Sequence, residues 1–173
     1  AVTSYDIWNN HPEKVLGVTK AWAEQNPDAH RALLLALLEA GRWLDQPDNR
    51  PQAIELLARG RYVNAPAEVI RMSMTGTLQY AADQPPLAVP DYNVFSRYAA
   101  GFPWRSHAEW FITQMYRWGQ IDFPVDIARM ATLIYRADLY REASWELGIS
   151  SPRVAFKSEG NHSGAWQLQD DGG

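Results

Sequence analysis

Charged side chains meet a short apolar segment between residues 10 and 19 of the sequence. His11 stands before Pro12, and a residue before proline avoids helical backbone angles, so a helix does not continue through this point. Residues 14–18 are rich in valine and leucine, which suits a short strand buried on both faces. A charge at the mouth of such a strand, with a helix behind it, is a common ligand crevice in open α/β folds. Lys14 is therefore the main candidate ligand-binding residue, as an ammonium that attracts an anion, and His11 is the second candidate.

A plainer interpretation of Lys14 stays open from these residues alone. Lysine side chains are mostly exposed, so a solvated lysine at the start of a strand is the default for this residue type. Strand alternation places Lys14 and Leu16 on one face of the predicted strand, and Glu13 with Val15 on the other. A strand start therefore fits both a ligand contact and a solvated side chain.

Composition excludes several classes of function. The net charge of −4 and the isoelectric point near 5.5 argue against direct nucleic-acid binding, since such domains carry a basic surface. The sequence has no cysteine, which removes disulfides, thiolate metal sites and thiol catalysis. The longest nearly uninterrupted apolar run, residues 32–38, is too short for a transmembrane segment. A hydrophobic fraction of 46% with 21% charged residues instead indicates a globular chain.

The sequence contains no recognisable catalytic or metal-binding motif. The zinc-protease, phosphate-loop, dinucleotide-binding and serine-hydrolase patterns are all absent. His107-Ala108-Glu109 resembles half of a zinc deaminase site, but the paired cysteines of the other half are missing. We expect Glu109 to close a capping box with Ser106 at a helix start, beside a surface His107. The sequence therefore predicts a binding protein that is not an enzyme and that holds no cofactor and no metal ion.

Eight tryptophans are an unusual number for a chain of 173 residues. Exposed indole rings can form a stacking platform for sugars or bases, which gives a sugar-binding module as an alternative function. Most of these tryptophans, however, stand at apolar positions of predicted helices. We therefore favour packing in the core and between lobes over a stacking platform.

The elements that position these residues are expected to be mainly helical, with one or two short strands. Proline and asparagine at helix starts, and glycine or polar runs at helix ends, set the boundaries. The expected helices cover residues 5–8, 20–25, 27–44, 51–58, 66–74, 106–118, 124–135 and 138–147, with a helical turn near 93–98. Residues 81–90 have no usable periodicity and are expected to form a loop, and the polar tail, 150–173, is expected to be loosely held. Because Thr3 and Ser4 form a helix cap at the very start, we also expect the chain to begin inside a larger protein.

Several motifs taken together resemble one known family. The run from Thr3 to Trp8 followed by His11-Pro12-Glu13-Lys14-Val15-Leu16-Gly17-Val18 is similar to the nitrate-binding subunit of ABC importers. Further matching motifs are Asn26-Pro27, Trp43-Leu44-Asp45, Asn64-Ala65-Pro66, Ser73-Met74-Thr75-Gly76, Phe102-Pro103-Trp104-Arg105-Ser106-His107, Arg117-Trp118-Gly119-Gln120-Ile121 and the stretch from Tyr135 to Ala143. The resemblance covers residues 1–149 with order and spacing kept, and this family also includes bicarbonate-binding subunits and cytosolic nitrate sensors.

The resemblance implies a fold and a function. The fold is the C-terminal part of a two-lobed α/β periplasmic-binding-protein-like fold (type II), formed here by residues 1–149. The function is binding of nitrate or nitrite in the periplasm, with the membrane subunits of an ABC importer as partners. In this family the lysine of the Pro-Glu-Lys motif, here Lys14, faces the anion, whereas bicarbonate-binding relatives have a glutamate that holds calcium. The tail from Lys157 to Trp166 resembles the sensor branch more closely, so the alternative is a cytoplasmic sensor that sequesters an RNA-binding antiterminator.

Overall fold

The computed structural model describes residues 3–8, 11–122 and 125–159. The helices within these ranges are α1 (Ser4–Ile7), α2 (Lys20–Gln25), α3 (Pro27–Leu44), α4 (Arg50–Leu57), α5 (Ala67–Thr75), α6 (Arg105–Arg117), α7 (Ile127–Ile134) and α8 (Ala137–Glu146). Two short 3₁₀ helices, η1 (Pro47–Asn49) and η2 (Arg97–Ala99), lie between them. Strands β1 (Thr77–Leu78) and β2 (Leu87–Ala88) pair antiparallel, with Thr77 opposite Ala88. The mainly helical content with two short strands confirms the predicted class.

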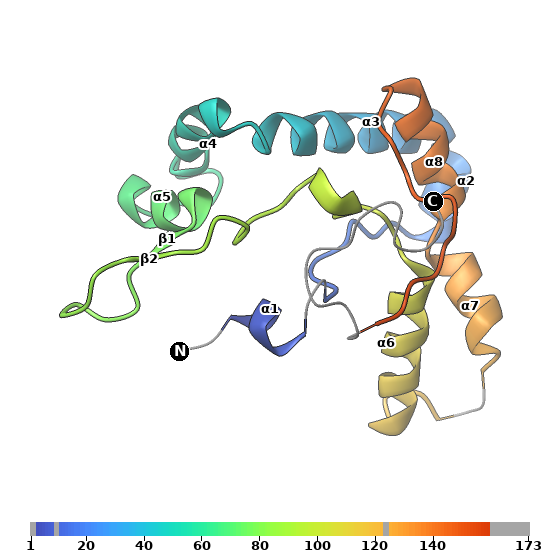
Figure 1. The fold of residues 1–173 in the computed structure, drawn as a ribbon. Helices are drawn as coiled ribbons and strands as arrows, with labels where there is room; N and C mark the ends of the chain where they lie inside the picture. Colours follow the sequence, from blue (N-terminus) through green and yellow to red (C-terminus); the bar gives the residue numbers. More distant parts are fainter. Residues whose placement is uncertain (1–2, 9–10, 123–124, 160–173) are drawn as a thin grey trace.

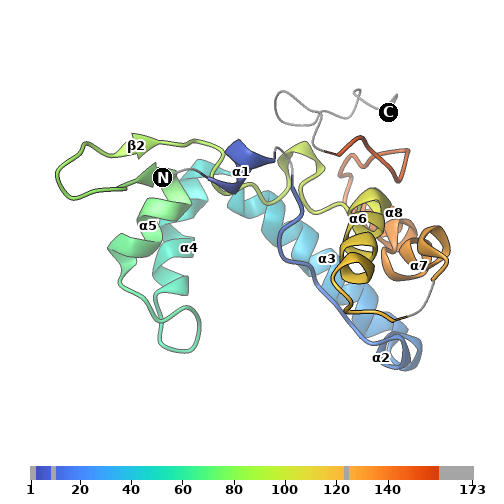
Figure 2. The ribbon, with the colours of Figure 1, turned by 90° about the horizontal axis from the view of Figure 1, so that it is seen from below.

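Helix α3 joins two groups of elements that lie near its opposite ends (Figures 1 and 2). Helices α4 and α5 and the β1–β2 hairpin gather at its C-terminal end, whereas α2 and α8 lie near its N-terminal end. Helices α6 and α7 pack against each other on the side of α8. An α-helix rises about 1.5 Å per residue, so an 18-residue helix is long enough, about 27 Å, to connect both groups.

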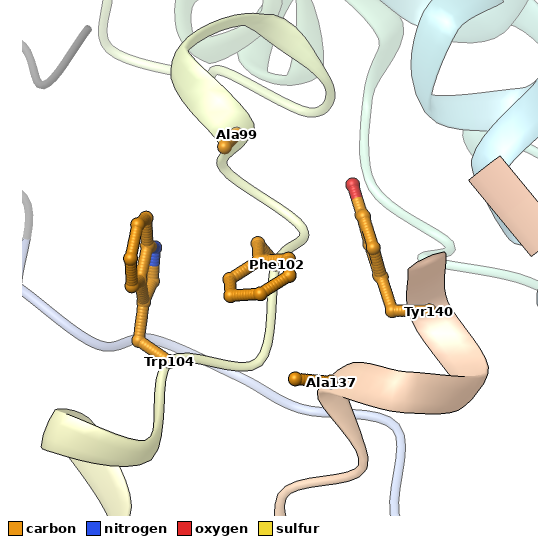
Figure 3. Packing of buried hydrophobic residues seen from close by; sticks show 5 residues of the cluster. All are labelled: Ala99, Phe102, Trp104, Ala137 and Tyr140. Carbon is orange, nitrogen blue, oxygen red and sulfur yellow. The ribbon is translucent and has the colours of Figure 1, made fainter. Parts of the chain in front are cut away.

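Two separate hydrophobic clusters correspond to these two groups. The first lies between α4 and α5 and has Ile54, 1% exposed, and Met74, 4% exposed, at its centre. The second is aromatic and combines the segment before α6 with α8, and its five members are Ala99, Phe102, Trp104, Ala137 and Tyr140 (Figure 3). The ring of Phe102 lies edge-on to Trp104 at 4.8 Å and to Tyr140 at 5.2 Å between ring centroids, a geometry that aromatic pairs prefer.

A buried acidic residue fastens the end of α3 to the segment that connects the two clusters. The Asp45 side chain is 3% exposed and accepts hydrogen bonds from the backbone N–H groups of Phe95, Ser96 and Arg97 at 2.7–3.0 Å. Arg50 lies 3.7 Å from the same carboxylate. These contacts fix the chain where it leaves the first cluster.

Arg50 extends this junction to two further elements. Its guanidinium donates to the backbone carbonyls of Leu44, Met74 and Asn93, and it lies over the Phe95 ring at 5.7 Å. The ends of α3 and α5 and the segment after the hairpin therefore share one side chain. Because five N–H donors are available on one arginine, few other residues could serve three carbonyls at once.

Most of the predicted helices are confirmed, including α3, whose bounds match the prediction at both ends. Thr3 caps α1 in a reciprocal capping box with Asp6, and Thr19 caps α2 through the N–H of Trp22. The predicted capping box of Ser106 with Glu109 is wrong. Helix α6 begins at Arg105 with no side-chain cap, so Ser106 lies inside the helix. Its hydroxyl donates to Glu159 at 2.6 Å, and its oxygen accepts from the backbone N–H of Lys157 at 3.3 Å.

Two other helix starts also differ from the prediction. Helix α7 begins at Ile127, where Asp126 caps the N–H of Arg129, and Pro124 lies outside the described residues. Helix α8 was expected to start at Asp138 but begins at Ala137, so Asp138 stands inside the helix, where its carboxylate binds Arg136. Asp126 accepts from a backbone N–H at the start of α7, whereas the guanidinium of Arg136 binds the carboxylate of Asp138. The neighbouring donor thus decides which role each aspartate takes.

The predicted strand at residues 14–18 is wrong for the described part of the chain. Residues 11–19 carry no regular secondary structure, and Val15, Leu16 and Val18 are 67%, 49% and 38% exposed. A strand exists only through hydrogen bonds to a neighbouring strand, and the described residues provide none for this segment. The apolar pattern was real, but the element depends on a partner that local sequence does not contain.

The predicted loop at residues 81–90 is also partly wrong, because β2 lies within it. Gly76 provides the physical reason for the hairpin. It ends α5 with φ +65°, and its carbonyl accepts a hydrogen bond from the N–H of Val89 at 2.6 Å. The left-handed backbone turns the chain directly from the helix into β1.

Replacing Gly76 with alanine is expected to lower the free energy of unfolding by about 3 kcal/mol or more, as judged by urea denaturation. A Cβ at this position would lie 2.1 Å from the carbonyl oxygen of Val89, in addition to the strain of positive φ. Gly119→Ala is the matched control, because Gly119 has φ +66° but no atom within 4 Å of its added Cβ. The control should cost only about 1–2 kcal/mol, and equal losses in the two variants would contradict the proposed contact.

The described part of the expected tail, residues 150–159, is packed and not loosely held. Pro152 is fully buried, and the Arg141 guanidinium donates to the carbonyls of Pro152, Arg153 and Val154 at 2.8–3.0 Å. The backbone N–H of Arg105 donates a hydrogen bond to the carbonyl oxygen of Ala155 at 2.8 Å. We call residues 152–159 the strap. The rest of the tail, 160–173, lies outside the described residues, and the division at residue 149 stays a prediction.

Candidate functional site

Lys14 lies on the extended segment between α1 and α2. Its side chain is 95% exposed, and its ammonium lies 3.0 Å from the Oε2 atom of Glu13. In residues 3–8, 11–122 and 125–159, Glu13 is the residue that pairs with it. The structure therefore gives this lysine one partner and leaves most of its surface open, without enclosing it in a pocket of this chain.

His11 lies next to this ion pair. Its side chain is 17% exposed, its Nδ1 lies 3.0 Å from the carbonyl oxygen of Pro12, and its Nε2 lies 3.7 Å from the Oε1 atom of Glu13. The carboxylate of Glu13 thus stands between His11 and Lys14. The expected placement of Glu13 and Lys14 on opposite faces is wrong, because alternation holds only in a strand.

The arrangement leaves the ammonium of Lys14 free to change partners at small cost. An exposed ion pair contributes only about 0–1 kcal/mol, because water screens the charges and two side chains lose freedom. An incoming anion can therefore replace Glu13 as the partner of Lys14. This segment provides one positive charge. Any further groups that contact a ligand would have to come from other parts of the protein.

A second polar cluster, which sequence reasoning missed, joins the strap to the start of α6. Glu159 accepts from the Ser106 hydroxyl at 2.6 Å and from the Lys157 ammonium at 2.5 Å, and the Nε2 atom of His107 lies 3.3 Å away. Lys157 is 2% exposed as a side chain. A lysine and a glutamate two residues apart in a polar tail carried no signal of burial. The expected surface position of His107 is also wrong, since its side chain is only 12% exposed.

The charge state of Glu159 reflects these contacts. Burial by itself raises the pKa of this carboxyl, but the interactions with His107, Lys157 and Ser106 outweigh burial and hold the pKa below its ordinary value. A carboxylate with a lowered pKa stabilises the folded chain above its unfolded pKa of about 4.3. That contribution disappears as the pH falls through the lower, folded-state pKa.

The contribution of Glu159 gives a testable pH dependence. As the pH is lowered from 5 to 3, the free energy of unfolding should fall more steeply in the wild type than in Glu159→Gln, because glutamine cannot titrate. Urea denaturation at a series of pH values measures this difference. Parallel curves for the two proteins would show that the carboxylate of Glu159 is not selectively stabilised in the folded chain.

The tryptophans divide into two groups. Trp104 is buried at 3% exposure, and Trp8 and Trp110 are half-buried and lie edge-on to each other at 4.9 Å, as expected for packing. Four others, Trp22, Trp43, Trp118 and Trp145, are exposed, so packing in the core is wrong for them, whereas packing between lobes stays a prediction. Those four come from different helices, α2, α3, the end of α6 and α8, and the ring contacts described among tryptophans are edge-on and not stacked.

The described residues contain neither a metal-ligand cluster nor a membrane-spanning helix. No group of three histidine, aspartate or glutamate side chains in this part of the chain could hold a metal ion. None of the helices in the described ranges has the length and apolar character that crossing a bilayer requires.

Comparisons with known proteins identify the class to which this geometry belongs. Residues 1–58 match the NMT1-like family. The crystal structure of the periplasmic nitrate-binding protein NrtA from Synechocystis PCC 6803 superposes with a TM-score of 0.81 and 30% identity, covering 88% of this chain and 41% of that chain. The chain therefore has the fold of part of a periplasmic substrate-binding protein.

Curated relatives show more narrowly which proteins this chain resembles. The chain is 31% identical over 157 residues to the nitrate/nitrite binding protein NrtA of Synechocystis. This alignment covers 89% of this chain and 35% of that protein. It is 39% identical over 145 residues to the bicarbonate transport ATP-binding protein CmpC of Synechococcus elongatus, covering 84% of this chain and 21% of that protein. The resemblance to nitrate-binding importer subunits is thus confirmed, and the chain spans about a third or less of the length of these relatives.

The portion shared with the ATP-binding relative carries no phosphate-loop motif, the pattern by which many proteins hold the phosphates of ATP. The matched portion of that relative is a fifth of its length. The related proteins that resemble this chain over most of its length include the binding protein NrtA, whose name describes the binding of nitrate and nitrite.

Proposed function

We propose that this chain is part of a protein that binds nitrate or nitrite for an ABC-type uptake system. The observation that carries the proposal is the exposed ammonium of Lys14, set in a Pro-Glu-Lys sequence on a fold that matches nitrate-binding NrtA. The proposed partners are the membrane subunits of the importer, and the proposed compartment is the periplasm, as for the solved relative.

The chemistry of nitrate suits a single lysine. Nitrate is a planar monoanion that loses water when a cleft closes on it, so one positive charge is enough to neutralise it. An ammonium on a flexible stem matches a single charge without the fixed bidentate geometry that an arginine fork imposes. Lys14 can leave Glu13 at little cost, because that pair is exposed.

Lysine at position 14 also favours nitrate over bicarbonate. In bicarbonate-binding relatives the resemblance places a calcium-holding glutamate where this chain has Lys14. A lysine would repel calcium from that position instead of coordinating it. The described residues offer no observation that favours the sensor or the sugar-binding alternative.

Calorimetric titration of the protein that carries this chain tests the proposal. Nitrate and nitrite should each give a saturable heat of binding, whereas chloride at equal ionic strength should give none. Bicarbonate with calcium, and glucose as the probe for tryptophan stacking, should also give none. Saturable binding of calcium-dependent bicarbonate or of glucose, with no response to nitrate, would overturn the proposed ligand class.

A further inference from the structure

Two hydrogen-bond donors and an imidazole nitrogen surround the carboxylate of Glu159 at the start of α6. The Ser106 hydroxyl donates a hydrogen bond to Oε1 at 2.6 Å, and the Lys157 ammonium donates to Oε2 at 2.5 Å. The Nε2 atom of His107 lies 3.3 Å from the same Oε2 atom. We propose that Ser106, His107 and Lys157 form a binding site for a planar oxoanion, which the chain fills with its own Glu159 carboxylate. This site is separate from Lys14 and does not depend on the proposed function.

Burial of Lys157 makes an anion necessary at this position. Its side chain is 2% exposed, and Glu159, itself 14% exposed, is the carboxylate that pairs with it within the described ranges. A buried ammonium without a counter-charge is strongly unfavourable, since water cannot solvate it. If the carboxylate were removed, the site would keep its demand for negative charge.

The geometry defines the chemical class of the ligand. Two oxygens of one planar group are recognised separately, one by a hydroxyl and the other by an ammonium and an imidazole nitrogen. Small carboxylates such as formate have the same planar pair of oxygens. Nitrate shares this planarity and single charge, so it belongs to the same class of ligand.

The strap holds Glu159 in the site as a tethered ligand. Arg141 fixes the carbonyls of Pro152, Arg153 and Val154 independently of Glu159, so the strap stays attached at one end. A tethered group has an effective concentration on the order of millimolar or higher, which a free anion must exceed to compete. In the wild type the site is therefore closed to dilute anions, and Glu159 acts as its plug.

Removal of the plug with restoration by formate tests this proposal. In Glu159→Ala, backbone amide exchange of residues 155–158 should accelerate about tenfold or more, because Lys157 and Ser106 lose a shared partner. Formate at tens of millimolar should restore the slower exchange, while chloride at equal ionic strength should not. Glu142→Ala, which removes an exposed glutamate from α8, is the matched control and should show neither effect.

Two further variants separate a binding site from a general loss of packing. Glu159→Ala with Lys157→Met should not respond to formate, because the ammonium that attracts the anion is gone. Glu159→Gln keeps the shape of the side chain and should show faster exchange without a formate response. Formate that slows exchange equally in the Lys157→Met double variant, or that has no effect in Glu159→Ala, would overturn the site. Lys14→Ala should leave the formate response unchanged, so this test and that of nitrate binding fail independently.

Discussion

Replacing Asp45 with alanine is expected to lower the free energy of unfolding by about 3–5 kcal/mol, the cost of breaking a buried, hydrogen-bonded charge pair. The carboxylate accepts from three successive backbone N–H groups and lies 3.7 Å from Arg50. Its removal leaves these N–H groups without their acceptor, and Arg50, 10% exposed as a side chain, without its counter-charge. Urea denaturation followed by circular dichroism measures the loss.

Two further variants test whether the loss of stability comes from the contacts of the Asp45 carboxylate. Asp48→Ala removes an exposed aspartate three residues away in η1 and should change stability by no more than about 0.5 kcal/mol. Asp45→Asn keeps the shape but replaces one acceptor oxygen with a donor, so it should still destabilise substantially. A similar small effect for Asp45→Ala and Asp48→Ala would show that the junction of α3 with residues 95–97 does not hold the fold together.

This junction explains why certain short motifs could be recognised in the sequence. Trp43-Leu44-Asp45 contains the carboxylate at the junction, and Ser73-Met74-Thr75-Gly76 contains both a carbonyl that Arg50 binds and the left-handed glycine. The motif from Phe102 to His107 contributes two rings of the aromatic cluster and Ser106. These matching motifs thus contain residues whose contacts join the elements of the fold.

Helix positions could be predicted because their signals are local. Pro27 at the first helical position and a continuous apolar stripe define α3 without any information from distant residues. The strand at 14–18 and the β1–β2 hairpin could not be predicted in the same way. A strand depends on its partner, and apolar residues alone specify neither the partner nor whether it lies in the same part of the chain.

The two polar sites, at Lys14 and at Glu159, also depended on information that local sequence does not contain. Lys14 was selected through a resemblance covering most of the chain, since its own surroundings fit a solvated lysine equally well. The sequence offered Ser106 a local role as a helix cap, but α6 begins one residue earlier and Ser106 lies inside it. Its hydroxyl instead links two residues of the strap, by donating to Glu159, 53 residues away, and by accepting from the N–H of Lys157. Local sequence does not show contacts over such a separation.

Replacing Lys14 with alanine is expected to weaken nitrate binding by about 2–5 kcal/mol, which is roughly thirtyfold to several thousandfold in the dissociation constant. The reason is that nitrate in a closed cleft would lose the ammonium that neutralises it. Lys14→Glu should abolish binding, because it replaces attraction with repulsion. Isothermal titration calorimetry with nitrate, on the protein that carries this chain, measures both effects.

Lys20→Ala is the matched control for Lys14→Ala. Lys20 is 88% exposed and lies 3.6 Å from Glu24, so it has the same side chain, a similar exposure and a comparable ion pair, only six residues away. Its removal changes the net charge equally and should leave nitrate affinity within about twofold, since a surface ion pair contributes about 0–1 kcal/mol. If both variants bound nitrate as the wild type does, Lys14 would be a solvated lysine, and the ligand would have to be held by other groups. If both weakened binding equally, the effect would be one of overall charge, and the assignment of Lys14 to the site would be wrong.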